Sequence, residues 1–253
     1  MIILVIGATG SIGSLVVAEA LRQGYSVRAL VRSHEKARRL PAKAEAVIGD
    51  LTRPNTLDFA VKDIDAIIFT HGSDGAGEVG SETVDYGGVW NILAELGSRK
   101  VRIALMTAIG VTNRTGSYIR FTESHDWKRR AERLVRASGC PYTIVRPRWF
   151  DYNKADEHKL FFLQGDTHFA GNSSDGVIAR RQIAEVLIGS LTSITRCRKP
   201  LSWLQPEGQH KRTWMNCSLH STQILQASSM VCATRPTSHL KTSRNEYRTT
   251  CTR

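Results

Sequence analysis

Short apolar runs alternate with longer amphipathic stretches over the first 195 residues of the 253-residue chain. Each run is short enough for one strand buried on both faces, and the stretches between the runs carry apolar residues at helical spacing. The predicted strands are Ile2–Ile6, Ser26–Val31, Ala46–Ile48, Ala66–Thr70, Val101–Thr107 and Tyr142–Val145. The predicted helices are Ser11–Arg22, Gly80–Gly97, Glu123–Ser138 and Arg180–Leu191. This alternation predicts an α/β fold, with a doubly wound parallel sheet covered by helices on both faces.

The pattern stops after residue 195. Ser and Thr are abundant there, and Trp203, Trp214 and Met215 follow neither the helical nor the strand period. We therefore divide the chain into a domain over 1–195 and a basic, irregular tail over 196–253. The tail holds 10 of the 35 Lys and Arg residues but 2 of the 23 Asp and Glu residues, so it carries +8 of the formal net charge of +12. Such charge attracts polyanions, but the tail has no nucleic-acid recognition motif, so nucleic-acid binding is not favoured.

Two interpretations of the tail remain open. One is a disordered, solvated basic tail. The other is a frameshift near residues 193 to 199, because Trp and Met have one codon each and an offset frame through Thr213–Cys217 must encode Leu/Met/Val-Asp-Glu-Leu. The same offset through Lys199–Gln205 can encode Thr-Phe-Glu-Leu-Val-Ala, an alternating strand pattern. We favour the frameshift, since it restores the periodicity that the visible tail lacks, and resequencing the gene tests it.

The cysteines and the N-terminus bear on the compartment. Cys140 lies in the domain and the other four cysteines follow residue 195; none forms a C-x-x-C pair or a zinc-ligand spacing. His158 and His168 fit no metal-ligand pattern either, so no metal is expected. The N-terminus has no secretion-signal pattern, and no apolar run approaches the roughly 18 residues needed to cross a bilayer. We expect a cytoplasmic protein without a membrane partner.

The most specific motif is a glycine-rich turn, Gly7-Ala8-Thr9-Gly10-Ser11-Ile12-Gly13, between the first strand and the first helix. Such a turn needs glycine because backbone and phosphate must approach closely and some φ angles are positive. The helix N-terminus then offers free N–H groups and a partial positive charge to a pyrophosphate. With a strand before it and a helix after it, the turn predicts a Rossmann fold that binds a dinucleotide.

The end of the second predicted strand indicates which dinucleotide. An NAD-binding protein has a carboxylate there, about 20 residues after the turn, to accept bonds from the ribose 2′-hydroxyl. This strand ends instead in Arg32-Ser33, and an arginine can pair with a 2′-phosphate. NADP(H) is therefore preferred over NAD(H), and Arg28 and Arg32 are the candidate phosphate ligands; the alternative is that both are simply solvated.

Several further motifs accompany the glycine turn and Arg32. They are Gly49-Asp50-Leu51, Val84-Asp85-Tyr86-Gly87-Gly88 with Asn91, Trp127-Lys128-Arg129-Arg130-Ala131-Glu132 and Tyr142-Thr143-Ile144-Val145-Arg146-Pro147. Together they resemble the atypical short-chain dehydrogenase/reductases, specifically the NmrA-like group of NAD(P)-binding proteins. The resemblance covers about residues 1 to 192, and the combination of motifs is what makes it specific.

The resemblance implies roles for individual residues. Asp50 and Leu51 match the pair that holds the adenine, and Thr70, His71 and Gly72 match the segment that passes under the cofactor ribose. Thr107 matches a serine that faces the nicotinamide, and Lys128 matches the lysine that binds the nicotinamide ribose. For Lys128 there is a plain alternative, since it begins a basic run that reads as a solvated helix face.

The departures from the family pattern concern the chemistry. The family's catalytic members carry, four residues before the lysine, a tyrosine whose pKa the lysine lowers; here that position is Ser124. Ala108 and Arg148 stand where Ser and Gly are common. Thr107, Lys128 and His125 are therefore our candidates for positioning and proton supply.

Two functions are consistent with these residues. The first is an NADP(H)-dependent oxidoreductase that reduces a small carbonyl, enone or quinone. The second is a non-catalytic NADP(H)-binding redox sensor, which the missing tyrosine favours. In either case the partner is a small molecule, and the sequence does not give the oligomeric state.

Overall fold

The computed structural model of the chain describes residues 1–73, 75–113, 123–151, 160, 162–164, 175–192 and 200–203. His158 and His168, which we set aside as metal ligands, lie outside the described residues. So does the predicted tail, except for residues 200–203.

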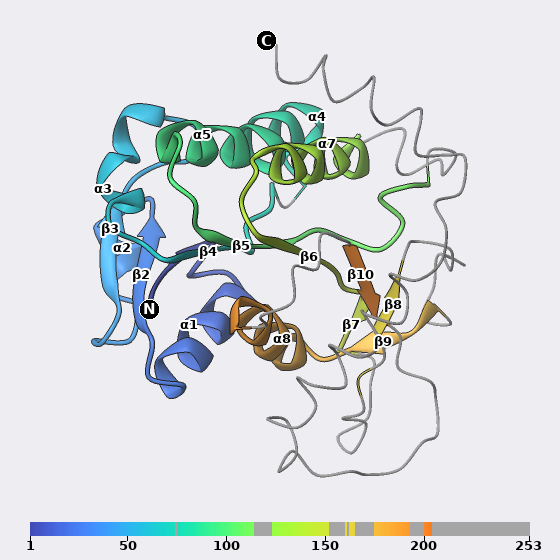
Figure 1. Ribbon diagram of the computed structural model, residues 1–253, viewed down its shortest axis with the longest axis horizontal. Helices are drawn as coiled ribbons and strands as arrows, with labels where there is room; N and C mark the ends of the chain where they lie inside the picture. Colours follow the sequence, from blue (N-terminus) through green and yellow to red (C-terminus); the bar gives the residue numbers. More distant parts are fainter. Residues whose placement is uncertain are drawn as a thin grey trace.

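A parallel sheet forms the centre of the domain (Figure 1). Its strands are β1 Ile2–Ile6, β2 Ser26–Val31, β3 Glu45–Ile48, β4 Ala66–Phe69, β5 Arg102–Met106 and β6 Tyr142–Arg146. The spatial order is β3-β2-β1-β4-β5-β6. Successive strands are thus added on one side of β1 up to β3 and on its other side from β4 onward, and the order reverses between β1 and β4. This strand order confirms the predicted doubly wound α/β fold. In such folds ligands bind outside the carboxyl ends of the strands at the point of reversal, here beside β1 and β4.

Helices cover both faces of the sheet (Figure 1). On one face lie α1 Gly13–Arg22 and α8 Arg180–Thr192; on the other lie α3 Asp58–Val61, α5 Gly87–Leu96 and α7 Ser124–Ala137. Strand residues alternate between two apolar cores: Ile67 and Phe69 of β4 join the core under α5 and α7, whereas Ala66 and Ile68 join the core under α1 and α8. Burial on both sides explains why the strands read as nearly continuous apolar runs.

One predicted helix is wrong in its geometry. Instead of a single α-helix over Gly80–Gly97, the chain forms α4 Gly77–Gly80, the π-helix η2 Ser81–Tyr86 and then α5. A π-turn accommodates one more residue per turn than an α-turn and therefore changes which residues face inward. Within it, Ser81 and Asp85 are buried. The Ser81 hydroxyl donates to the Gly77 carbonyl at 2.9 Å, so this side chain is satisfied within the helical segment.

Several short elements complete the fold. They are α2 His34–Ala37, the 3₁₀ turn η1 Pro54–Thr56, the two-stranded sheet of β7 Trp149–Phe150 and β9 Val177–Ile178, and the strands β8 Phe162–Gln164 and β10 Pro200–Trp203. β10 extends the main sheet beyond residue 195: it pairs in parallel with β6, Leu201 opposite Val145, and β8 pairs antiparallel with β10. No helix in the described ranges is long and apolar enough to cross a membrane.

Candidate cofactor site

The glycine turn after β1 packs against the turn after β4. Gly7 has φ of +83°, and a Cβ there would lie 2.8 Å from the backbone nitrogen of His71. The Gly10 N–H donates to the Gly7 carbonyl at 2.9 Å and closes the turn. A side chain at Gly7 is therefore excluded twice, by its backbone angle and by the neighbouring chain.

Gly13 allows α1 to approach the same turn. A Cβ at Gly13 would lie 2.0 Å from the Gly7 carbonyl oxygen, closer than any nonbonded contact permits. Ala8 and Ile12 are buried and anchor the turn, Thr9 is half-buried, and Gly10 and Ser11 are exposed. The first turn of α1 contains no acidic residue. The exposed backbone at this helix N-terminus fits a pyrophosphate, whose negative charge the helix dipole stabilises.

The two arginines of β2 have different environments. Arg28 is buried; its Nε donates to Glu45 at 2.8 Å, and its Nη1 donates to the carbonyls of Phe59 and Lys62. The prediction that Arg28 meets a phosphate is therefore wrong, because its guanidinium ties β2 to the connection that follows β3. Arg32, by contrast, is exposed at the carboxyl end of β2 and makes no hydrogen bond or ion pair within the described part of the chain.

Ser33 and Asp50 lie beside Arg32. The Ser33 hydroxyl caps α2 by accepting the Lys36 N–H at 3.3 Å. Asp50 accepts two bonds from Thr52, from its N–H and its hydroxyl, both at 2.9 Å. Burial raises the pKa of Asp50, but the bonds from Thr52 and the charges of Arg32 and Arg53 outweigh it, so the pKa is below its ordinary value. Asp50 is thus an ionised carboxylate near Arg32, at the predicted adenosine end.

Leu51 lines the same end of the site. Its carbonyl accepts a 2.6 Å bond from Asn91 of α5, and a Cβ at Gly88 would lie 3.0 Å from its Cδ1. The contact fixes an apolar wall between the end of β3 and α5. Such a wall suits the flat face of an adenine, as the resemblance implies for this residue.

The segment after β4 contains Thr70, His71 and Gly72. The Thr70 hydroxyl donates to the Ile6 carbonyl at 2.8 Å, and Gly72 is exposed. His71 Nε2 lies 3.1 Å from the Val84 carbonyl, so Nε2 carries the proton. Burial lowers the pKa of His71 to about 4, although the charge of Asp85 opposes it, and the ring is neutral near neutral pH. Its buried Nδ1 has no hydrogen-bond partner among the described residues.

Lys128 of α7 reaches the same edge of the sheet. Its Nζ lies 2.9 Å from Asp85 Oδ1, and its side chain is 22% exposed. Asp85 also accepts bonds from the Ser73 N–H at 3.2 Å and the Ser73 hydroxyl at 2.8 Å. The interpretation of Lys128 as part of a solvated helix face is therefore wrong. The neighbouring cations are engaged as well: Arg129 pairs with Asp126, and Arg130 stacks 4.1 Å from the centre of the Trp127 ring.

Thr107 belongs to a buried ionic network. Its hydroxyl donates to Glu132 Oε1 at 2.8 Å, and Glu132 also binds Arg146 through two bonds and Arg136 through one. Burial raises the pKa of Glu132, but Arg146 and Arg136 outweigh it, so the pKa stays below its ordinary value. The expectation that the Thr107 hydroxyl faces the nicotinamide is not met, because its proton is donated into the core.

His125 lies in the first turn of α7, one residue after Ser124. A Cβ at Gly110 would lie 3.8 Å from His125 Cε1, so the imidazole packs near the turn that follows β5. This places His125 on the same side of the sheet as Lys128, and its role in proton supply stays a prediction.

Arg148 is a residue of this region to which the sequence assigned no role. It follows β6, is 2% exposed, and lies against Asp175: its Nη1 donates to the Asp175 carbonyl and is 4.0 Å from Oδ1. Trp149 Nε1 donates to the same carboxylate at 3.4 Å. The one signal in the sequence was the departure from the family's glycine at this position.

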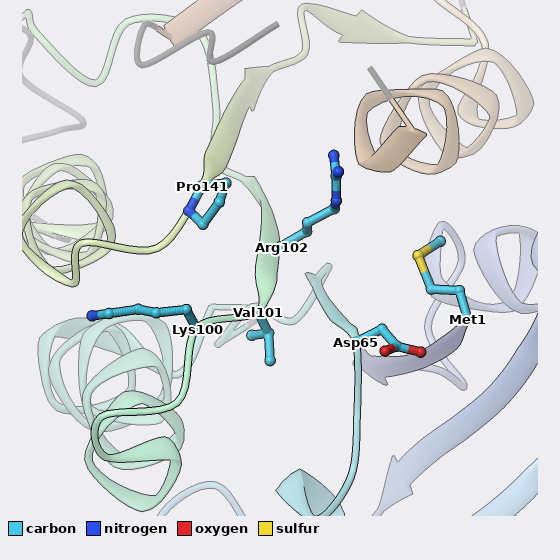
Figure 2. A pocket seen from close by; sticks show the side chains of 6 residues that line it. All are labelled: Met1, Asp65, Lys100, Val101, Arg102 and Pro141. Carbon is cyan, nitrogen blue, oxygen red and sulfur yellow. The ribbon is translucent and has the colours of Figure 1, made fainter. Parts of the chain in front are cut away.

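A hollow of about 540 Å³ lies at the opposite edge of the sheet. Figure 2 shows its lining: Met1, Asp65, Lys100, Val101, Arg102 and Pro141, at or just before the amino ends of the strands. Asp65 accepts the Ile2 N–H at 2.7 Å, and Lys100 donates to the Ser138 carbonyl at 2.7 Å. Ligands of doubly wound sheets bind at the carboxyl ends of the strands. We therefore do not assign the cofactor to this hollow.

The fold and the glycine turn define a dinucleotide-binding protein of the Rossmann type. The sequence pattern of the NAD(P)H-binding family matches residues 7–193, and the chain belongs to this family. This agrees with the predicted resemblance to the atypical short-chain dehydrogenase/reductases.

Three relatives show the range of the family. The chain is 32% identical over 216 residues to protein TIC 62, chloroplastic, of Oryza sativa subsp. japonica, covering 74% of this chain and 42% of that protein. It is 31% identical over 196 residues to the uncharacterized sugar epimerase YhfK of Bacillus subtilis, covering 76% and 88%. It is 34% identical over 147 residues to the photosystem II assembly factor Ycf39 of Cyanophora paradoxa, covering 58% and 44%. The chain thus spans about two fifths of the length of TIC 62.

Solved structures share the fold. A putative NAD-dependent epimerase/dehydratase from Bacillus halodurans has a TM-score of 0.69 at 23% identity, covering 81% of this chain and 94% of that chain. ChuY, an anaerobillin reductase from Escherichia coli O157:H7, has a TM-score of 0.67 at 20% identity, covering 83% and 100%. A short-chain dehydrogenase/reductase from Veillonella parvula in complex with NADP has a TM-score of 0.62 at 15% identity, covering 85% and 99%.

Proposed function

We propose that the chain is an NADP(H)-dependent reductase that passes a hydride from the nicotinamide to a small carbonyl, enone or quinone. The observation that carries the proposal is the glycine turn. Gly7 and Gly13 leave no room for a side chain, yet the backbone at Gly10 and Ser11 is open to an anion. Two proteins that share the fold support the proposal: ChuY is an anaerobillin reductase, and the Veillonella parvula protein is in complex with NADP.

The preference for NADP(H) rests on Arg32. It is exposed at the end of β2, where a carboxylate would select NAD(H), and it leaves its guanidinium available for a 2′-phosphate. Asp50 and Leu51 hold the adenine next to it.

We expect Arg32→Ala to weaken NADPH binding about ten- to hundred-fold, because one charge-assisted contact is lost, and to leave NADH binding nearly unchanged. Lys62→Ala is the matched control, because Lys62 is exposed and lies just before β4, at the opposite edge. Equal losses for both cofactors in Arg32→Ala would contradict the assignment.

At the other end of the site, each side chain has a defined task. The bound nicotinamide supplies the hydride. Lys128 donates to the hydroxyls of the nicotinamide ribose, and the loop after β4 supports that ribose from below. The proton that balances the reduction of a carbonyl comes from His125 or from solvent, because the Thr107 hydroxyl is engaged by Glu132.

The second candidate function is a non-catalytic NADP(H)-binding sensor. Two observations favour it: Ser124 stands at the position of the family's tyrosine, and Lys128 is neutralised by Asp85. A phenol needs a nearby cation to lower its pKa, and here the cation is paired with a carboxylate instead. A relative named as an assembly factor, Ycf39, is consistent with a binding role.

One experiment separates the two functions. Purified protein is mixed with NADPH and a panel of quinones, enones and aldehydes, and the nicotinamide absorbance is followed. Consumption of NADPH with any acceptor, above the rate in the Gly13→Ala variant, supports the reductase. Tight NADPH binding without consumption across the panel contradicts the reductase and supports the sensor.

The cytoplasmic location is part of the same proposal. The TIC 62 relative is named as a chloroplast protein, and this makes the location worth measuring. Cell fractionation of the native protein with an antibody tests it, and recovery in an organelle fraction would contradict it.

A further inference from the structure

A single buried carboxylate connects three segments at the carboxyl edge of the sheet. Asp85, on the π-helix η2, is 2% exposed at its side chain. Its Oδ1 receives Lys128 Nζ from α7 at 2.9 Å and the Ser73 N–H at 3.2 Å, and its Oδ2 receives the Ser73 hydroxyl at 2.8 Å. The carboxylate is therefore held from several sides. Lys128, with 22% of its side chain exposed, is the partner that retains freedom to turn toward a ligand.

The charges around this pair cancel one another. His71 is neutral near neutral pH, since burial lowers its pKa to about 4. Glu132, one turn further along α7, pairs with Arg146 and Arg136, and Asp126 pairs with Arg129. Removing either member of the Lys128–Asp85 pair leaves one uncompensated charge in a partly buried place, where solvent screens it less than at the surface.

The nicotinamide half of the cofactor lies over this region if the proposed function holds. Arg32 and Asp50, at the ends of β2 and β3, mark the adenosine half, so the other half extends over β4 and β5. The nicotinamide ring carries one positive charge when oxidised and none when reduced. A lone Lys128 would repel only the oxidised ring.

We propose that the Lys128–Asp85 ion pair sets the preference of the site between oxidised and reduced cofactor, with Asp85 cancelling the repulsion between Lys128 and the oxidised ring. Asp85 is a positioning residue in this proposal, because it acts through Lys128. The proposal rests on the proposed binding of NADP(H). It explains why the carboxylate lies on a π-turn that directs it inward.

The test measures the ratio of the two dissociation constants, Kd for NADP⁺ divided by Kd for NADPH. Nicotinamide fluorescence gives Kd for NADPH with the full-length protein, and displacement of NADPH gives Kd for NADP⁺. Asp85→Asn keeps an acceptor for Ser73 but removes the charge, and we expect it to raise the ratio about five-fold. Lys128→Met weakens both affinities through lost ribose bonds, but it leaves Asp85 unpaired and should lower the ratio about five-fold.

The controls separate charge from structure. Asp58→Asn removes the same charge from an exposed position on α3 and should leave the ratio unchanged. A purely structural role for Asp85 would weaken both affinities equally, and an unchanged ratio in Asp85→Asn would overturn the proposal. If Asp85→Asn does not fold, as judged by circular dichroism, the sign of the shift in Lys128→Met decides. A wild-type protein that binds neither cofactor would instead overturn the proposed function.

Discussion

Over β1, β2 and β3 the carboxyl edge of the sheet offers open backbone and an exposed cation, whereas over β4, β5 and β6 its polar side chains are paired with one another. In the first half, Gly10, Ser11 and Arg32 are exposed. In the second half, Lys128 pairs with Asp85, Thr107 donates to Glu132, and Arg148 contacts Asp175. The first half is ready for a ligand, and the second half satisfies its own charges.

The two halves of this edge therefore differ in what ligand binding requires of them. An anion at the glycine turn contacts backbone groups that need no rearrangement. The conformational entropy of ordering them is already lost when the backbone folds around Gly7 and Gly13. A ligand at the second half must exchange an existing ion pair for its own contacts. Under the proposed function, the nicotinamide lies over this second half, and its oxidation state is expected to affect the Lys128–Asp85 pair.

The largest effect is expected at the most deeply buried pairing. Glu132 is 0% exposed and binds Thr107, Arg146 and Arg136. Glu132→Gln should lower the free energy of unfolding by about 3–5 kcal/mol, because it leaves two arginines without their counter-charge. Urea unfolding at pH 7 measures it. Asp126→Asn removes the more exposed i,i+3 partner of Arg129 on the same helix and should cost less than about 1 kcal/mol. Similar losses in both variants would show that burial of Glu132 adds nothing to the stabilisation that its ion pairs provide.

The next largest effect on the unfolding free energy is expected for a substitution in the glycine turn. Gly13→Ala places a Cβ 2.0 Å from the Gly7 carbonyl oxygen, so the helix or the turn must move. We expect a loss of about 1–3 kcal/mol in unfolding free energy, together with loss of NADPH binding measured by fluorescence. Gly189→Ala is the matched control on α8, because nothing lies within 4 Å of the added atom. It should stabilise the protein by about 0.5–1 kcal/mol and leave NADPH binding intact. NADPH binding by Gly13→Ala with wild-type affinity would show that the turn is not the phosphate site.

The two arginines of β2 are expected to have separate roles, Arg28 in stability and Arg32 in cofactor choice. Arg28→Met should destabilise the fold by about 1–3 kcal/mol, since the Phe59 and Lys62 carbonyls lose their donor. The ratio of NADH to NADPH affinity should not change in this variant. Arg32→Ala should do the reverse, with a changed ratio and little loss of stability. Thermal unfolding and cofactor titration of both variants test these expectations. A changed ratio of NADH to NADPH affinity in Arg28→Met would show that Arg28 contributes to phosphate binding after all.

The spacing of apolar residues along the sequence was sufficient to predict most strands and helices of the fold. The bounds of β1 and β2 agree with the predicted runs, and α7 and α8 agree within one residue at each end. These elements are specified by apolar spacing within a short window. The π-turn of η2 was missed because one extra residue inside a helix hardly changes that spacing, whereas it does change the face on which Asp85 lies.

The site was predicted less completely, for a different physical reason. The glycine turn could be recognised because its constraint is local, a positive φ and a close approach. The partners of Arg28, Thr107 and Arg148 lie 17 to 34, 25 and 27 positions away in the chain. Spacing along one element contains no information on such pairs. For the same reason, nothing in the sequence showed that Lys128 and Asp85 meet.

The smallest expected effect lies on the other face of the sheet, where α1 packs against α8. Burial raises the pKa of Glu185 to about 7, against the attraction of Arg181 and with added repulsion from Glu19. Between about pH 4.5 and pH 7 the folded protein holds a proton at Glu185 that the unfolded chain has released. This group therefore contributes stability that is fully present below about pH 4.5 and is lost as the pH rises to about 7. Since the carboxylate is partly exposed, we expect the unfolding free energy to rise by only about 1 kcal/mol from pH 8 to pH 5, relative to Glu185→Gln. Urea unfolding of both proteins across this range measures the difference. If Glu185→Gln kept the full pH dependence, the raised pKa would not belong to Glu185, and a group elsewhere in the chain would have to titrate near neutrality.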